Sequence, residues 1–263
     1  MKIKKTNRRE TYDSHIDINN VNIYAVIIGS EILNRKREDK HFDYLSTQLS
    51  KVGHTLFASF IIKDDAELIK QIYTLIKNDP KAFMFSFGGI GSTPDDLTRE
   101  LSAKIFKDAQ MHRNKKFEQD IINRIGERAY PHPIKMSDLP ADAELLHNPI
   151  NNMSGYYLNE TYFFMPGFPD MAQPMIDGII KEHLPLSVKI YTRSFIANIG
   201  EGILIELMNN VPNEIELSSL PLMNNGNPKV EFSLSCTDET KVELHFKKFT
   251  DFLNAKEIVY HLL

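Results

Sequence analysis

The sequence of 263 residues contains a single cysteine and no long apolar run. The lone Cys236 excludes an internal disulfide and a cysteine-rich zinc site, and it favours a reducing compartment. Because Cys236 lies in an alternating strand pattern, we expect it to be a packed core thiol. No stretch is long and apolar enough to span a membrane, and the basic start is not followed by the apolar segment of a secretory signal. The expected location is therefore the cytoplasm.

A strong excess of charge of either sign is also missing. The formal net charge is -4 and 25% of the residues are charged, so composition gives no electrostatic reason to expect nucleic acid as a partner. No Ser-His-Asp arrangement, P-loop or zinc motif is identifiable, and no histidine has a partner at metal-ligand spacing. The apolar fraction is that of an ordinary globular protein, and the length suits one larger and one smaller domain.

The most informative stretch is residues 82–99, with the sequence AFMFSFGGIGSTPDDLTR. Its first six residues predict a strand that is covered on both faces. The glycines then allow a sharp turn with bare N–H groups, and Thr93 is expected to cap a helix that begins at Pro94 and ends near residue 107. Free amides at a helix start form an anion site. The residues expected to form it are Gly88, Gly89, Gly91, Ser92 and Thr93.

Two carboxylates, Asp95 and Asp96, follow this glycine loop directly. They would repel a phosphate unless a cation bridged them, so we interpret the element as a phosphate site with a divalent metal. An interpretation without a ligand also exists, because Thr93 with Asp96 three residues later resembles a helix capping box. A capping box accounts for Thr93 and one aspartate, but not for the glycines and a second acidic pair.

That second acidic pair is Asp64 and Asp65, which lie between a strand predicted at residues 55–62 and a helix. One of the two is expected to cap the helix, and the other to reach the edge of the sheet where Asp95 and Asp96 lie. We expect Asp64, Asp95 and Asp96 to hold the metal. All four aspartates are candidate catalytic residues.

The first strand, predicted at residues 22–28, ends in a loop at the same edge of the sheet. Candidate ligand contacts in this loop are Gly29, Ser30 and Glu31. A surface carboxylate is an equally good interpretation of Glu31. A run of mixed charge then opens a helix predicted near residues 42–52, and within that run Arg37 and His41 are expected to contact a ligand.

A second turn of the same kind occurs at residues 165–169, MPGFP, where a strand leads through a glycine into a helix. We expect Pro166 and Gly167 to form a second wall of the site, since another helix start offers another place for an anion. The pattern beyond residue 183 predicts a small α+β unit in which no catalytic constellation is identifiable. Residues 1–20 are polar and charged, which is typical of a loosely ordered extension.

The motif GGIGSTPDDLTRE resembles the signature of the molybdopterin-binding (MoaB/Mog-like) family, in the version found in the amino-terminal domain of CinA-like proteins. Three further segments are similar to that family in the expected order: IIGSEIL at residues 27–33, the Asp64–Asp65 pair, and the later Asn148-Pro149 with MPGFP. This chain departs from the family at Ser30, where the family has an aspartate, and at Met171, where it has a glutamate.

The resemblance implies an α/β fold of three layers, αβα, with a mostly parallel sheet, followed by a small α+β second domain. The expected domains are a polar extension at residues 1–20, a molybdopterin-binding-like domain at 21–183 and the small domain at 184–263. Because members of the family are often oligomers, we also expect a homo-oligomer.

The resemblance leads to three functional hypotheses. The first is a nucleotide pyrophosphatase that acts on ADP-ribose-like substrates with Mg²⁺, Mn²⁺ or Co²⁺. The second is molybdopterin binding or adenylylation in molybdenum cofactor biosynthesis. The third is a ligand-binding module without turnover, which the departures at Ser30 and Met171 favour. In each case the expected partner is a phosphorylated small molecule, either a nucleotide or a pterin, and neither nucleic acid nor a membrane.

Overall fold

The computed structural model describes residues 21–184, 189–224 and 227–263, so the predicted extension at residues 1–20 lies outside the described residues. The chain divides into two compact units, residues 1–187 and 188–263. Among the described residues, no helix has both the length and the apolar character needed to cross a bilayer.

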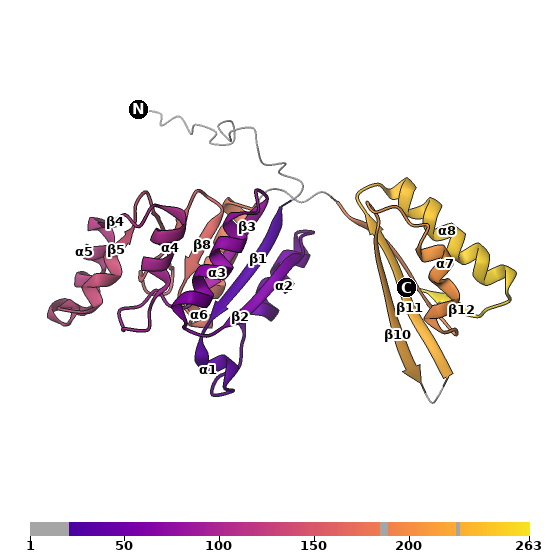
Figure 1. Cartoon of the computed structure of the whole chain (residues 1–263), viewed down its shortest axis with the longest axis horizontal. Coiled ribbons are helices and arrows are strands. Elements are labelled where there is room, and N and C mark those ends of the chain that lie inside the picture. The colour runs from indigo at the N-terminus through magenta and orange to yellow at the C-terminus, as the bar shows by residue number, and fades with distance from the viewer. Residues whose placement is uncertain (1–20, 185–188, 225–226) are drawn as a thin grey trace, which may run out of the picture. The chain divides into compact units, whose positions relative to one another are not determined.

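The first unit is built on a six-stranded mixed sheet (Figure 1). In spatial order its strands are β2 (Leu56–Ile62), β1 (Asn22–Ile28), β3 (Ala82–Phe87), β8 (Tyr162–Met165), β7 (Gly155–Leu158) and β6 (Glu144–Leu146). The first four are parallel to one another, whereas β7 and β6 are antiparallel to their neighbours. The parallel arrangement brings the carboxyl ends of β2, β1, β3 and β8 to one edge of the sheet. The predictions of strands at 22–28 and 82–87 are confirmed at both ends.

Helices cover both faces of this sheet, which confirms the three-layer prediction. One face packs against α3 (Ala66–Lys77), α4 (Thr98–Phe106) and α5 (Lys115–Ile125). The other packs against α2 (His41–Lys51) and α6 (Pro169–Glu182). Strand β1 is apolar from Ile23 onward because both of its faces are covered: Tyr24 and Val26 point to the first helix layer, and Ile23 and Ala25 to the second.

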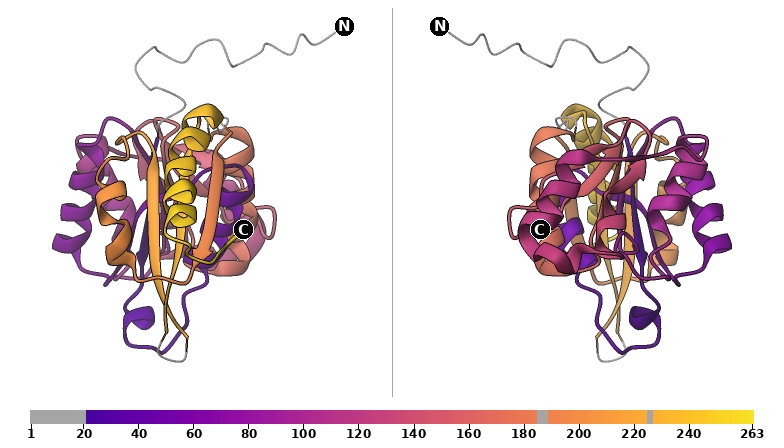
Figure 2. Two further views of the ribbon diagram at one scale, coloured as in Figure 1. Left: turned by 90° about the vertical axis from the view of Figure 1, so that its right-hand side faces the viewer. Right: turned by 90° about the vertical axis from the view of Figure 1, so that its left-hand side faces the viewer.

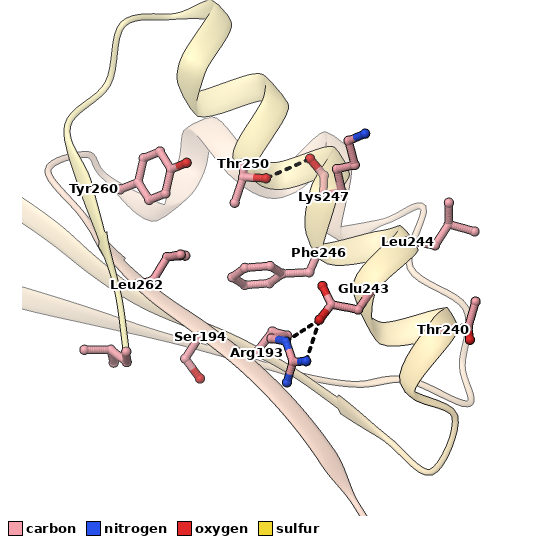
Figure 3. A pocket seen from close by; sticks show the side chains of 11 residues that line it. Arg193, Ser194, Thr240, Glu243, Leu244, Phe246, Lys247, Thr250, Tyr260 and Leu262 are labelled. Atoms are coloured by element: carbon pink, nitrogen blue, oxygen red, sulfur yellow. Dashed lines mark hydrogen bonds and ion pairs between the residues drawn. The ribbon is translucent and has the colours of Figure 1, made fainter.

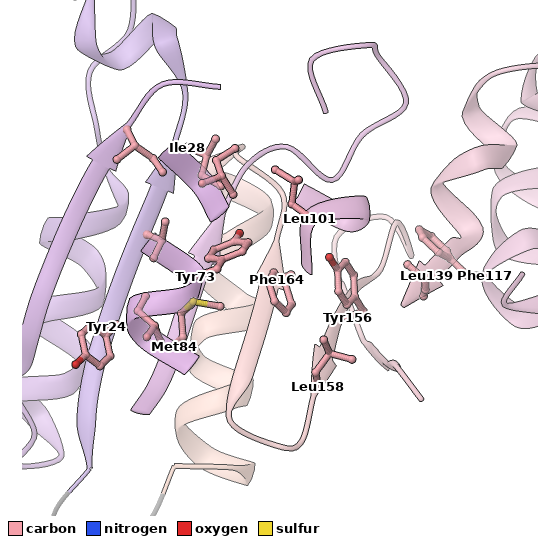
Figure 4. Packing of buried hydrophobic residues seen from close by; sticks show 14 of the residues in the cluster. Tyr24, Ile28, Tyr73, Met84, Leu101, Phe117, Leu139, Tyr156, Leu158 and Phe164 are labelled. Carbon is pink, nitrogen blue, oxygen red and sulfur yellow. The ribbon is translucent and has the colours of Figure 1, made fainter. Parts of the chain in front are cut away.

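The core on the α3 side contains the rings of Tyr73, Phe164 and Tyr156 (Figure 4). The hydroxyl groups of these two tyrosines each pair with a buried serine. The Tyr73 and Ser86 hydroxyls lie 2.8 Å apart, and so do those of Ser102 and Tyr156, all four side chains being buried. Each hydroxyl therefore has a partner, as buried polar groups require. Ser86 is fully buried in β3, where its hydroxyl serves core packing.

One helix begins later than the sequence predicts. Helix α4 begins at Thr98 and not at Pro94, because residues 94–97 remain in a turn that belongs to the glycine loop. Helix α5 ends at Ile125, where Gly126 has a φ of 59°, and the 3-10 helix η2 (Gly126–Ala129) follows it. Asn159 and Glu160 form the hairpin turn between β7 and β8, with φ angles of 54° and 55°.

A small lobe is inserted between α4 and β6. It consists of α5, η2, η3 (Pro133–Ser137) and the short antiparallel pair β4 (Met111–Arg113) and β5 (Asp138–Pro140). Arg113 joins the two strands through Asp138, with Nε 2.5 Å from Oδ1, and also contacts Glu118 on α5 at 2.9 Å. This lobe lies next to the glycine loop, because Arg99 donates hydrogen bonds to carbonyls of both.

The second unit is a four-stranded sheet with helices packed on one face (Figures 1 and 2). Its strand order is β10 (Glu216–Asn224), β11 (Asn227–Cys236), β9 (Tyr191–Ala197) and β12 (Tyr260–Leu262), and all its pairings are antiparallel. Helix α8 (Glu239–Ala255) lies across this sheet, and the short η4 (Glu201–Leu204) and α7 (Ile205–Met208) precede β10. Cys236 is buried in this core, as expected.

Candidate functional site

Four loops meet in a row at the carboxyl edge of the parallel strands. The loop after β1 contacts the loop after β2, because the Ser30 N–H donates to Asp64 Oδ2 at 2.8 Å. The loop after β3 lies against β1, where a Cβ added to Gly88 would be 2.3 Å from the Ile28 carbonyl oxygen. The loop after β8 touches the same glycine, since a Cβ on Gly167 would be 3.3 Å from Gly88 Cα. The predicted ligand residues of these loops therefore lie along one edge.

The two aspartates after β2 have different roles. Asp65 caps α3, with its side chain accepting a hydrogen bond of 2.8 Å from the Leu68 N–H. Asp64 faces the other way and joins the first loop, where the Ser30 hydroxyl also accepts from the Asp64 N–H at 3.4 Å. Of the acidic pair, only Asp64 reaches the neighbouring loop. Glu31 folds back over that loop, and its carboxylate would crowd a Cβ on Gly29 at 2.9 Å.

The glycine loop depends on backbone angles that side chains disfavour. Gly88 and Gly89 have φ angles of 94° and 67°, which glycine adopts without steric cost. Thr98 closes the loop from below: its N–H donates to the Gly89 carbonyl at 2.9 Å and its hydroxyl to the Gly88 carbonyl at 2.9 Å. Helix α4 therefore begins at Thr98, where the chain returns to the glycines, rather than at the Thr93 predicted from local capping.

Four consecutive amides of this loop are left for a ligand. The N–H groups of Gly89, Ile90, Gly91 and Ser92 have no acceptor among the described residues, whereas the next one, Thr93, donates to Asp96 Oδ2 at 2.8 Å. Successive free N–H groups in a glycine turn form a concave site for an anion. The loop therefore has the free amides that the sequence analysis expects of an anion site.

Asp95 and Asp96 converge on one hydroxyl group. Thr93 Oγ1 lies 2.5 Å from Asp95 Oδ1 and 2.6 Å from Asp96 Oδ2, so the two carboxylates lie around the same point. The hydrogen bond from Thr93 lowers the pKa of Asp95, which keeps that carboxylate ionised. Asp96 also lies against the loop itself, because a Cβ on Gly91 would be 2.5 Å from its Oδ2.

Carboxylate oxygens of this kind are suitable ligands for a divalent cation. In the described part of the chain, however, no group of three or more His, Cys, Asp or Glu side chains gathers as a metal centre. Asp64 is committed to the Ser30 loop, and the pair Asp95–Asp96 is committed to Thr93. The residues present fit an ion of the Mg²⁺ type, which uses one or two carboxylates and completes its shell with water and ligand phosphates.

Arg99 is a site residue that sequence reasoning missed. It is 9% exposed, and its guanidinium donates to the Gly91 carbonyl at 2.6 Å, to the Asp138 carbonyl at 3.2 Å and to the Lys135 carbonyl. One buried cation therefore connects the glycine loop to the small lobe. The sequence contains no signal for this role, because the partners in the lobe are 36 and 39 residues away.

His41 supports the second wall from beneath. The side chain is 2% exposed, stacks on Phe87 with ring centroids 4.5 Å apart, and places Nε2 3.3 Å from the Gly167 carbonyl oxygen. A carbonyl can only accept, so Nε2 carries the proton, and Nδ1 has no partner in the described structure. Burial lowers the pKa of His41. The contact expected with a ligand is thus replaced in this structure by a contact with the turn that forms the wall.

The wall itself ends in an exposed aromatic ring. Phe168 follows Gly167, is 56% exposed and is the N-cap residue of α6. Arg37, an exposed residue of the loop before α2, holds its guanidinium 5.7 Å from the centre of this ring. Pro166 and Gly167 occupy the turn between β8 and α6, as predicted.

The motif residue Asn148 and the nearby Gly155 both have structural explanations. Asn148 is fully buried and holds its own loop through hydrogen bonds to Asn151 at 3.0 Å and to the Met153 carbonyl at 3.1 Å. Gly155 permits close contact of β7 and β8, since a Cβ there would lie 2.3 Å from the Phe164 carbonyl oxygen. Met171 lies near this loop, with its sulfur 3.5 Å from Asn151 Nδ2.

Neither of two hollows in the structure includes a predicted site residue. One of about 690 Å³ lies in the second unit between α8, β9 and β12, and its floor is formed by Phe246, Tyr260 and Leu262 (Figure 3). The polar groups there are partly paired with one another, as in the Arg193 Nε to Glu243 Oε1 contact of 2.6 Å. A smaller hollow of about 210 Å³ lies beside α5. We place the candidate site at the glycine loop because free amides and convergent carboxylates occur there together.

Comparison with known proteins gives consistent results. Residues 24–185 match the family model described as "Probable molybdopterin binding domain". A CinA-like protein of Nostoc punctiforme is 26% identical over 230 residues, which is 83% of this chain and 55% of that protein. Another from Flavobacterium psychrophilum is 26% identical over 233 residues, covering 81% and 54%. The chain thus spans about half the length of these relatives.

A solved structure shows the same fold. The crystal structure of the protein CinA from Thermoplasma acidophilum matches with a TM-score of 0.55 and 21% identity, and the match covers 62% of this chain and 99% of that one. The resemblance inferred from the sequence motifs is therefore confirmed, as is the fold that it implied.

Proposed function

This chain belongs to the family of probable molybdopterin binding domains, and from that premise we propose that its glycine loop binds a phosphorylated small molecule, a nucleotide or a pterin, together with a divalent cation. The most specific form of the proposal is a nucleotide pyrophosphatase that acts on ADP-ribose-like substrates. The phosphorylated group would lie on the loop after β3, between the loops after β1 and β8.

One observation supports this proposal above all others. The free N–H groups of residues 89–92 are followed at once by two carboxylates that converge on the Thr93 hydroxyl. The amides suit phosphate oxygens, whereas the carboxylates would repel them if no cation were present. A phosphate and a divalent cation bound side by side satisfy both groups, and a capping interaction alone would not require the free amides.

The residues of the chain can contribute to hydrolysis by positioning the phosphate and by stabilising its charge. Breaking a phosphoanhydride depends mainly on positioning and on the stabilisation of charge. The amides of residues 89–92 would bind and orient the phosphate oxygens, and Thr98 with Arg99 would keep these amides in place. Asp95 and Asp96 would hold the cation, which when bound supplies neutralisation of phosphate charge.

The test is release of AMP from ADP-ribose by the full chain with Mg²⁺, Mn²⁺ or Co²⁺. We expect activity that requires the metal and that is lost in Asp96→Ala, while the matched variant Asp251→Ala on α8 keeps it. Pyrophosphate binding in the presence of Mn²⁺, followed by calorimetry, gives a readout independent of turnover. Absence of both binding and hydrolysis in the unchanged protein would contradict the proposal.

A second candidate function is ligand binding without turnover. It is favoured by Met171, a thioether at the position where the family has a glutamate, and by the use of Ser30 to join two loops. Here a nucleotide or a pterin would raise the thermal midpoint without any product, because a ligand selective for the folded state stabilises it. Formation of an adenylylated pterin from ATP would instead identify the adenylylating activity of molybdenum cofactor biosynthesis.

A further inference from the structure

We propose that Phe168, flanked by Arg37, is the surface on which the planar ring of the ligand stacks. This inference rests on the proposed function, because it assigns the ring-binding part of the same site. It extends that function from the phosphate to the remainder of the ligand, a purine or a pterin.

The position of Phe168 supports this role. Phe168 directly follows Gly167, whose added Cβ would be 3.3 Å from Gly88 Cα, so Phe168 is the next residue along the chain after one that lies against the glycine loop. With an exposed fraction of 56%, the ring contributes little to the core. An aromatic face in this place offers a ligand ring the apolar contact and the π surface that stacking requires.

Arg37 adds a second element to the same surface. Its guanidinium lies 5.7 Å from the ring centre, within the range of a cation–π contact. Arg37 forms no ion pair with any described residue, so its charge is available to a ligand. A guanidinium can stack on an aromatic plane and also bind phosphate, whereas the ring of Phe168 can only stack.

The wall that carries Phe168 is held from the inside. His41 stacks on Phe87 and contacts the Gly167 carbonyl, so the residue just before Phe168 is fixed by a buried side chain. Helix α6 fixes the other side of Phe168, since Phe168 is the N-cap residue, its carbonyl accepts from the Ala172 N–H at 3.0 Å, and Pro169 is the first residue of the helix. Phe168 is therefore an exposed ring on a rigid support, which limits the entropy lost when a ligand stacks on it.

The experiment compares ligands with and without a ring on the full chain. Inorganic pyrophosphate and ADP-ribose, each with Mn²⁺, are titrated into the unchanged protein and into Phe168→Ala. We expect Phe168→Ala to weaken ADP-ribose binding by about 5- to 150-fold, the range typical of removing an aromatic side chain that stacks on a base, and to leave pyrophosphate binding unchanged. Neopterin phosphate, as a third ligand, distinguishes a pterin from a purine.

Two controls separate stacking from general damage. Phe57→Ala removes a ring that is 62% exposed on β2, and it should leave the binding of both pyrophosphate and ADP-ribose unchanged. Arg37→Met keeps an apolar side chain but removes the charge, so it should weaken the binding of pyrophosphate as well as that of ADP-ribose.

The chain has no tryptophan. Phe168→Trp therefore introduces a single fluorescent tryptophan, whose emission should change when ADP-ribose is added but not when pyrophosphate is added. In Phe57→Trp, neither ligand should change the tryptophan emission.

The results distinguish this inference from the proposed function. Equal binding of the ring-bearing ligands by the unchanged protein and by Phe168→Ala would overturn the stacking role and leave the phosphate site intact. If the unchanged protein bound neither pyrophosphate nor any ring-bearing phosphate, the proposed function and the stacking role would both be wrong. Selective loss of either the purine or the pterin ligand in Phe168→Ala would support the inference and identify the ring.

Discussion

The carboxylate of Asp64 accepts a hydrogen bond of 2.8 Å from the main-chain N–H of Ser30, 34 residues earlier in the chain. This bond holds the loops after β1 and β2 side by side. Asp65, the next residue, uses its carboxylate instead to cap the N-terminus of α3. Two adjacent and chemically identical side chains therefore allow a matched comparison between a contact that shapes the site and a contact that stabilises one helix.

Replacing these aspartates should separate stability from binding. Asp64→Ala should lower the unfolding free energy by about 1.5 kcal/mol, the lower end of the range for a hydrogen bond to a charged group, and should weaken pyrophosphate binding. Asp65→Ala should cost about 1 kcal/mol as a lost helix cap and leave binding unchanged. Urea unfolding and calorimetry measure the two effects. A binding defect of equal size in both variants would contradict the assignment.

Glycine is required at Gly88 but not at Gly178. Gly88→Ala should destabilise the fold by at least about 1–3 kcal/mol, because φ is 94° and the new Cβ would meet the Ile28 carbonyl oxygen at 2.3 Å. Gly178 lies within α6, and an added Cβ there meets nothing within 4 Å. Gly178→Ala should therefore raise stability by roughly 0.5–1 kcal/mol, since alanine is the better helix former. Thermal unfolding of both variants checks the prediction, and a loss of stability in Gly178→Ala would contradict it.

The buried hydroxyl pair behind the glycine loop should behave as one unit. Tyr73→Phe leaves the Ser86 hydroxyl without its partner at 2.8 Å, which should cost about 1–3 kcal/mol. In a double-mutant cycle, Ser86→Ala added to Tyr73→Phe should cost less than the sum of the two single changes. Tyr44→Phe is the matched control, because its hydroxyl bonds Asp177 at an exposed position, and it should cost less than Tyr73→Phe. Simple additivity of the pair would exclude the coupling.

Stability should fall in mild acid through His41. Burial lowers the pKa of His41 below its ordinary value of 6.5, so the unfolded chain binds this proton more readily than the folded protein. The contribution of His41 is therefore complete above pH 6.5 and is lost as the pH falls toward the lowered value, by at most about 1.4 kcal/mol per pH unit.

Urea midpoints between pH 8 and pH 5 provide the measurement. The pH dependence should be shallower in His41→Gln than in the unchanged protein, whereas His112→Gln, a change at an exposed residue of β4, should leave it as it is. The pKa of His183 is also lowered by burial, but His183 is present in every protein compared and its effect cancels. Parallel pH profiles for the unchanged protein and His41→Gln would show that the imidazole does not titrate as described.

The sequence predicted the strands and the edge of the site better than it predicted the start of α4. Residues 82–87 form a continuous apolar run, and such a run identifies a strand buried on both faces. Thr93 and Pro94 are equally good local signals for a helix start, yet the helix begins at Thr98. The reason is a tertiary contact: Thr98 bonds the Gly88 and Gly89 carbonyls, and residues 93–97 are needed to complete the turn.

Burial of charged and titratable side chains was the least predictable property. Arg99 and His41 lie in charged, helix-like stretches that suggest solvent exposure, but both are buried against carbonyl oxygens of distant loops. Periodicity reports which face of a helix is apolar and contains no information on contacts made 36 or 126 residues away. The split roles of Asp64 and Asp65 were expected as alternatives, and only the structure assigns each one.

The bonds of Arg99 have a consequence for how this domain can vary during evolution. The chain leaves the neighbourhood of Arg99 after α4, forms the small lobe, and returns at Lys135 and Asp138. The Arg99 guanidinium therefore lies where the lobe begins and bonds the carbonyls where it ends. Insertions or deletions within the intervening lobe can accumulate without moving Gly91, provided that the two returning carbonyls are preserved. Relatives of different length are therefore expected to differ there while keeping an arginine at the base of the glycine loop.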